Sequence, residues 1–137
     1  MRILLTLSVF LFVLVGCQTD ESHLTEKEVV KALQENGIEL IKTKNPKSIY
    51  SSKLAHVKPA TYELNGKSLV IYQFDTEIDR DKGKAEFVKK TESMNLTSAS
   101  SFEINNLLIY YVHDQELHSD NVPFEKEIQE IINEIKK

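Results

Sequence analysis

The sequence predicts an α+β fold: an antiparallel sheet of about four to five strands, arranged as two hairpins, with about three helices packed on it in two layers. Three observations support this class. Asn65-Gly66 separates two β-type runs, residues 107–112 are apolar throughout, and residues 124–135 repeat apolar side chains at helical spacing. A chain in which helices and hairpins follow one another favours helices packed against an antiparallel sheet.

The first helix is expected over residues 26–36. Thr25 and Glu28 have the spacing of a capping box, in which each side chain accepts a hydrogen bond from the other residue's backbone N–H. Gly37 suits the position just past the helix, where a positive φ ends it. Both ends of this helix are therefore marked by local chemistry.

The next segment carries weaker signals. Residues 38–41 are typical of a short strand. Residues 43–59 are expected to form a partly helical connection, anchored on the core by Ile49, Tyr50 and Leu54.

The clearest β signal lies at residues 60–74. Asn-Gly tolerates the positive φ angles that a type I′ turn needs at both central positions, so Asn65-Gly66 predicts a hairpin of residues 60–64 with residues 67–74. The second of these strands has apolar residues on both faces, which places it inside the sheet.

A second helix is expected from Asp75, acting as the N-cap, to about residue 91. Its apolar positions are Ile78, Ala85, Phe87 and Val88. Gly83 weakens the middle of this helix by about 1 kcal/mol relative to alanine.

A small, polar link at residues 94–101 leads to the second hairpin. Residues 102–104 and 107–112 lie on either side of Asn105-Asn106, and the longer strand is apolar on both faces. A charged loop at 113–121 follows, and Pro123 suits the first turn of the final helix. The apolar face of that helix is formed by Phe124, Ile128, Ile131, Ile132 and Ile135.

Residues 1–16 have the pattern of a signal peptide. Arg2 supplies a positive start, and the apolar run at 3–15 is thirteen residues long. A transmembrane helix needs about 20 residues, whereas the apolar region of a signal peptide has roughly 7–15. Residues 17–23 then form a short tether that starts at a cysteine to be lipidated, and residues 24–137 form a single domain.

The end of the apolar run, Leu14-Val15-Gly16-Cys17, resembles the lipobox of bacterial lipoproteins. The resemblance implies that signal peptidase recognises Leu14, Val15 and Gly16, and that Cys17 is acylated and becomes the first residue of the mature chain. Two other interpretations stay open: an ordinary secretory signal with a stray cysteine, and an uncleaved N-terminal anchor. Two acyl chains hold a protein on a membrane stably.

Composition narrows the choice of partners. Cys17 is the only cysteine, so no disulfide forms within the chain. Without Arg2, the mature chain has 16 Lys and Arg against 21 Asp and Glu, a net charge of −5. This acidic balance argues against nucleic acid, which requires a basic surface, and against docking on anionic lipid headgroups.

The charged loop holds the densest group of potential ligands. His113, Asp114 and His118 are weak candidates for a metal site, with Glu116 and Asp120 beside them. Their spacing matches no known motif, so a solvated loop is the preferred interpretation and no metal or other cofactor is predicted.

No catalytic pattern is present, because no serine, cysteine or glycine-rich loop stands in a known catalytic motif. The tyrosines at 50, 62, 72, 110 and 111 either line a ligand groove or pack inside the sheet, and packing is the preferred interpretation. We therefore predict no catalytic residues and no enzyme activity.

Most of the chain is similar to small lipoproteins of Gram-positive bacteria, which are mostly uncharacterised. The similarity rests on the lipobox, the capped first helix, and the segments IYQFD and NNLLIYYV separated by one helix. It implies a lipid-anchored protein on the extracytoplasmic face of the cell membrane.

Three functions remain open for such a protein. The expected one is a non-enzymatic binding or interaction module, with an envelope protein as a possible partner. The alternatives are a small solute- or metal-binding lipoprotein that uses the 113–120 loop, and an envelope enzyme.

Overall fold

The computed structural model describes residues 23–44, 47–114 and 121–136. The elements, in chain order, are α1 (Glu26–Glu35), β1 (Ile41–Thr43), the 3-10 helix η1 (Ile49–Ser51), β2 (Ala60–Leu64), β3 (Lys67–Gln73), α2 (Glu77–Thr91), β4 (Ala99–Ile104), β5 (Leu107–Val112) and α3 (Glu125–Ile135). The predicted α+β class is confirmed, with five antiparallel strands and three α-helices. The proposed signal peptide, Cys17 and the tether up to residue 22 lie outside the described residues.

The strands form one sheet in the order β1-β2-β3-β5-β4, and every neighbouring pair is antiparallel. Since β5 is antiparallel to both β3 and β4, these two strands run in the same direction, and α2 is the crossover between them. Within the described part of the chain, β1 and β4 are the two edges of the sheet.

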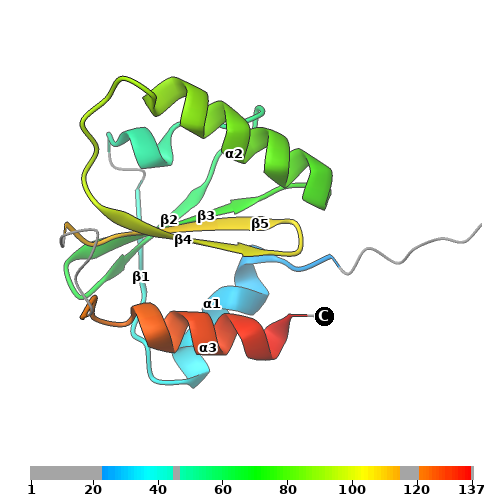
Figure 1. The fold of residues 1–137 in the computed structure, drawn as a ribbon. Coiled ribbons are helices and arrows are strands. Elements are labelled where there is room, and N and C mark those ends of the chain that lie inside the picture. The colour runs from blue at the N-terminus through cyan, green and yellow to red at the C-terminus, as the bar shows by residue number, and fades with distance from the viewer. Residues whose placement is uncertain (1–22, 45–46, 115–120, 137) are drawn as a thin grey trace, which may run out of the picture.

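Helices cover both faces of the sheet, so the domain has three layers rather than the two expected (Figure 1). α1 and α3 pack on one face, and α2 and η1 pack on the other. The reason lies in β3 and β5: Leu69 and Ile71 belong to one core and Val70 and Tyr72 to the other, and all four are buried. A strand that is apolar on both faces needs a cover on each of them.

The first hairpin forms as predicted. Asn65 and Gly66 have φ angles of 48° and 77°, which are the positive values that a type I′ turn requires. The register follows from this turn, with Leu64 opposite Lys67 and Ala60 opposite Ile71.

The capping box of α1 is also confirmed. The helix then ends in a Schellman motif, because the N–H of Gly37 binds the carbonyl of Gln34 and the N–H of Ile38 binds that of Leu33. The predicted strand at 38–41 is therefore wrong at its start: Ile38 still belongs to the helix terminus, and β1 begins at Ile41.

Two further boundaries differ from the prediction. β4 begins at Ala99 within the predicted polar link, because its pairing with β5 continues to Val112. α3 begins at Glu125, after Phe124 with a left-handed φ of 68°, so Pro123 lies before the helix. The apolar face of α3 is as predicted, with Ile128, Ile131 and Ile132 buried.

α2 is rotated relative to the prediction. Its N-cap is Thr76, whose hydroxyl accepts from the N–H of Asp79, and not Asp75. Of the predicted apolar positions, only Phe87 is buried, whereas Ile78 is 62% and Val88 59% exposed. Gly83 is the cause: a Cβ there would lie 2.4 Å from the Phe74 ring, so only glycine lets this face of the helix approach the sheet.

Asn106 joins three segments of the chain in the interior. Its side-chain oxygen accepts from the N–H of Leu24 at 2.8 Å, and its side-chain nitrogen donates to the carbonyl of Phe74 at 2.7 Å. All three residues are buried. The turn between β4 and β5 thus fixes both the entry of the chain into α1 and the end of β3.

We expect Gly83→Ala to lower the free energy of unfolding by about 1–3 kcal/mol, because the new methyl group overlaps the Phe74 ring. Helix propensity alone predicts a gain of roughly 1 kcal/mol. Urea unfolding followed by circular dichroism measures the change. In a Phe74→Leu background the substitution should cost less than half as much, and equal costs in the two backgrounds would contradict this explanation.

Asn106→Ala should lower the free energy of unfolding by about 2–5 kcal/mol, because it removes the partners of a buried N–H and a buried carbonyl. Asn95→Ala, at an exposed asparagine, is the matched control and should change it by less than about 0.5 kcal/mol. Hydrogen exchange should show the Leu24 amide losing protection in the Asn106 variant. Equal stability of the two variants would argue against this role for Asn106.

Candidate functional site

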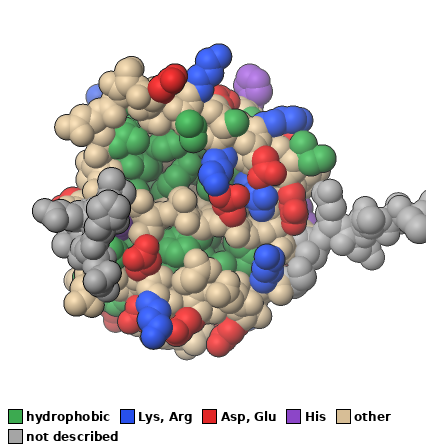
Figure 2. Space-filling view, in the orientation of Figure 1, with side chains coloured by type: hydrophobic (Ala, Val, Ile, Leu, Met, Phe, Trp, Pro, Cys, Tyr) green, Lys and Arg blue, Asp and Glu red, His purple; other side chains and the backbone are tan. Residues whose placement is uncertain are grey.

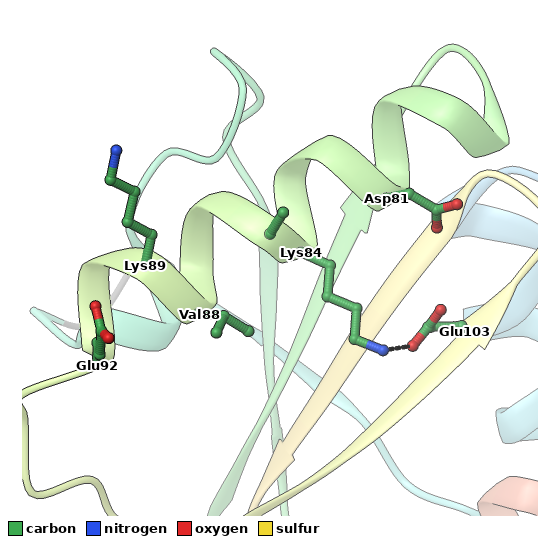
Figure 3. Close-up of a pocket in the computed structure, with 7 residues that line it drawn as sticks. Asp81, Lys84, Val88, Lys89, Glu92 and Glu103 are labelled. Atoms are coloured by element: carbon green, nitrogen blue, oxygen red, sulfur yellow. Dashed lines mark hydrogen bonds and ion pairs between the residues drawn. The ribbon is translucent and has the colours of Figure 1, made fainter.

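An open groove of about 700 Å³ lies between α2 and the edge strand β4 (Figure 3). Its lining residues are Asp81, Lys84, Ala85, Val88, Lys89, Glu92 and Glu103. All but Glu103 belong to α2 or, for Glu92, to its C-cap. In Figure 3, Lys84 and Val88 extend from the helix toward the strand, and Glu103 lies opposite Lys84.

The rotation of α2 creates the apolar part of this groove. With Gly83 and Phe87 turned to the sheet, Ala85 and Val88 face outward on the side of β4. Figure 2 shows the resulting hydrophobic surface, hollowed below α2. The same figure shows hydrophobic side chains on the other side of the strand as well.

The charged side chains of the groove form a network. Lys84 pairs with Glu103, and Arg80 pairs with Asp81 at 2.8 Å while donating to the carbonyl of Asn105. Arg80 also lies 3.9 Å from Glu103. Asp81 and Glu103 thus have cationic neighbours, and the groove combines an apolar wall with side chains of both charges.

The backbone of β4 offers hydrogen-bonding groups beside this groove. The N–H of His113 binds the carbonyl of Ser98 at 3.1 Å. This bond shows which residues of β4 direct their backbone groups toward β5. Antiparallel ladders alternate, so Ala99, Ser101 and Glu103 direct their N–H and C=O groups away from β5. No described strand pairs with β4 on that side.

A second, smaller hollow lies on the other side of the strand edge, toward α3. Its volume is about 490 Å³. It is lined by Ser101, Phe102, Glu125, Lys126, Gln129 and Glu130. The edge of β4 is therefore a ridge between two shallow grooves.

The predicted metal candidates do not come together within the described residues. His113 is 3% exposed, and its Nε2 atom lies 3.1 Å from the hydroxyl of Ser100. Asp114 is exposed and pairs with Lys67 at 2.7 Å. His118 lies outside the described residues, among which no group of three or more His, Cys, Asp and Glu side chains could hold a metal ion.

Ser100, His113 and Glu125 form a cluster that sequence reasoning missed. The Ser100 hydroxyl donates to a carboxylate oxygen of Glu125 at 2.5 Å, so it accepts from Nε2–H of His113. A nucleophilic serine needs the reverse arrangement, in which the imidazole takes the serine proton and the acid orients the imidazole. The cluster instead ties β4, β5 and the start of α3 together.

The five tyrosines belong to the interior. Tyr50, Tyr72 and Tyr110 pack with Phe87 in the core on the α2 face, and Tyr62 and Tyr111 lie in the core on the other face. Burial raises the pKa of each of these phenols above its ordinary value, so all five are neutral at physiological pH. The preferred interpretation, packing rather than a ligand groove, fits these positions.

Comparison of the chain with protein-family models, with curated protein sequences and with solved structures finds no match. Among the described residues, none of the helices has both the length and the apolar character needed to span a membrane.

Ser100→Ala should lower the free energy of unfolding by about 1–2 kcal/mol, because the hydroxyl joins His113 to Glu125. Ser93→Ala, at an exposed serine, should change it by less than about 0.5 kcal/mol. Ser100 should also resist a serine-directed fluorophosphonate, because its proton is directed to Glu125. Labelling of the wild-type chain that Ser100→Ala abolishes would overturn this structural role.

Proposed function

We propose that the chain is a lipoprotein, anchored through Cys17 on the extracytoplasmic face of the cell membrane, whose domain is a non-enzymatic interaction module. The observation that carries the proposal is Leu14-Val15-Gly16-Cys17 at the end of the apolar run 3–15. Acylation also gives the single cysteine a role other than that of an exposed reactive thiol.

The start of the domain fits a short anchor. Leu24 is buried and bound to Asn106, so only six residues, 18–23, separate Cys17 from the folded chain. Six extended residues span at most about 20 Å. The domain would therefore stay close to the membrane surface, where it meets other envelope proteins.

The edge of β4 supports the interaction role. Free main-chain groups of an edge strand pair with a further strand, and apolar grooves beside it take up side chains of the partner. The groove at α2 supplies Ala85 and Val88 for such contacts, with side chains of both charges beside them. These features suit binding of a protein surface better than activation of a small molecule.

Cys17→Ser is expected to move the protein from the detergent phase to the aqueous phase in a Triton X-114 partition of expressing bacteria. At least two acyl chains hold a protein on a membrane stably, so their loss abolishes the partition. Ser22→Ala, in the tether, should partition like the wild type. Intact mass should show a chain that begins at an acylated Cys17.

The two other interpretations of residues 1–16 predict other intact masses of the chain. A cleaved chain without acyl groups in the aqueous phase would indicate an ordinary secretory signal. A detergent-phase chain that retains residues 1–16 would indicate an uncleaved anchor. Either result would refute the lipoprotein proposal.

A further inference from the structure

We propose that the partner at β4 is a second copy of this chain, paired antiparallel to β4 about a two-fold axis through Ser101. This inference names the partner of the proposed interaction module. The dimer proposal depends on the proposed lipoprotein function at one point only, the placement of both copies on one membrane.

The direction of the backbone N–H and C=O groups of β4 allows this pairing. Ala99, Ser101 and Glu103 point their N–H and C=O groups outward, as derived from the bond between His113 and Ser98. In the dimer, Ser101 faces Ser101 of the second copy, and Ala99 faces Glu103 on either side. Each of these three pairs exchanges two hydrogen bonds, and the two sheets become continuous.

The side chains select this register. A register centred on Glu103 sets two carboxylates directly opposite each other, which is destabilising. A register centred on Ala99 carries the pairing beyond the start of the strand at residue 99. The register centred on Ser101 avoids both, and it places small side chains at its middle.

The groove on the α2 face becomes self-complementary about the same axis. α2 runs opposite to β4, and its Lys84 contacts Glu103. Along β4, Ser101 precedes Glu103 by two residues, a distance of about 6.7 Å. About four residues of a helix cover the same distance. Val88 is therefore level with the axis, and the two-fold brings the exposed Val88 side chains of the two copies to face each other.

Charge complementarity follows from the position of Val88. Lys84 and Glu92 lie at equal distances along α2 on either side of it, and both line the groove. The two-fold therefore sets Lys84 of one copy level with Glu92 of the other, twice. An unrelated strand could pair with the same backbone groups, but the symmetric charge pattern favours a copy of this chain.

On the α3 face, too, oppositely charged side chains are placed symmetrically about the two-fold axis. α3 runs along β4 in the same direction (Figure 1), and its Glu125 binds Ser100. Ser101 is thus level with residues 127–128, midway between Lys126 and Glu130. The axis sets Lys126 of each copy opposite Glu130 of the other.

The two-fold axis is perpendicular to the sheet, so α1 and α3 of both copies lie on the same side. Leu24 belongs to the core on that side. The first buried residue of each copy therefore lies on the side of α1 and α3, so that two lipid anchors could reach one membrane.

The test uses the full chain, purified from bacterial membranes in a large excess of detergent micelles, with the protein molar mass measured by size-exclusion chromatography and light scattering. The wild type should have twice the mass of one chain. Ser101→Pro should be a monomer that keeps the wild-type circular dichroism spectrum, because the lost N–H points away from β5. Glu92→Lys should raise the dimer dissociation constant about tenfold or more, because it faces Lys84 of the second copy.

Cross-linking in intact membranes locates the contact. A short bis-maleimide should link Ser101→Cys into dimers and leave Ile41→Cys, at the exposed residue of the other edge strand, unlinked. The wild-type chain, in which the proposed acylation blocks the Cys17 thiol, is the control for any background from Cys17.

A monomeric wild type, a dimer that survives Ser101→Pro, or a dimer linked through Ile41→Cys would overturn the proposal. A different protein held at β4 in place of the second copy would overturn it as well. The phase partition of Cys17→Ser tests the lipid anchor without reference to the dimer. Failure of the dimer proposal and failure of the lipoprotein proposal are therefore distinguishable.

Discussion

The pairing of β3 with β5 is the constraint on which the rest of the domain depends. Both strands are buried on both faces, and residues such as Ile71 and Ile109 pair across one core while Tyr72 and Leu108 pair across the other. Two such strands must lie at the centre of the sheet, and helices must cover them on both faces. α1 and α3 provide one cover and α2 with η1 the other, and the short β1 and the polar β4 are left at the edges.

The cover on the α2 side is the less complete of the two, and this produces the groove. A single long helix lies there, held against the sheet by the contact of Gly83 with Phe74. That contact fixes the rotation of the helix and turns Val88 outward, beside the uncovered edge of β4. A packing requirement in the core thus determines which apolar residues reach the surface, and the proposed docking surface is its consequence.

Local signals were sufficient for part of the fold. The turn at Asn65-Gly66, the capping box of α1 and the apolar face of α3 depend on residues within one or two turns of each other, and all three are confirmed. The rotation of α2 was not predictable, because it depends on Phe74 lying under Gly83. The candidate site was missed for the same reason: β4 is an edge only because β5 pairs between it and β3, which no local pattern reveals.

The start of the described chain and the proposed docking strand meet at one buried side chain. Asn106 lies in the turn that joins β4 to β5, and it holds Leu24, the residue that follows the tether. Arg80 binds the neighbouring carbonyl of Asn105, so the start of α2 is fixed to the same turn. The segment that enters α1, the helix that forms the groove and the strand that offers its edge are therefore held in one arrangement. The proposed interaction module needs such rigidity, because a loosely held docking strand would lose entropy each time that it paired.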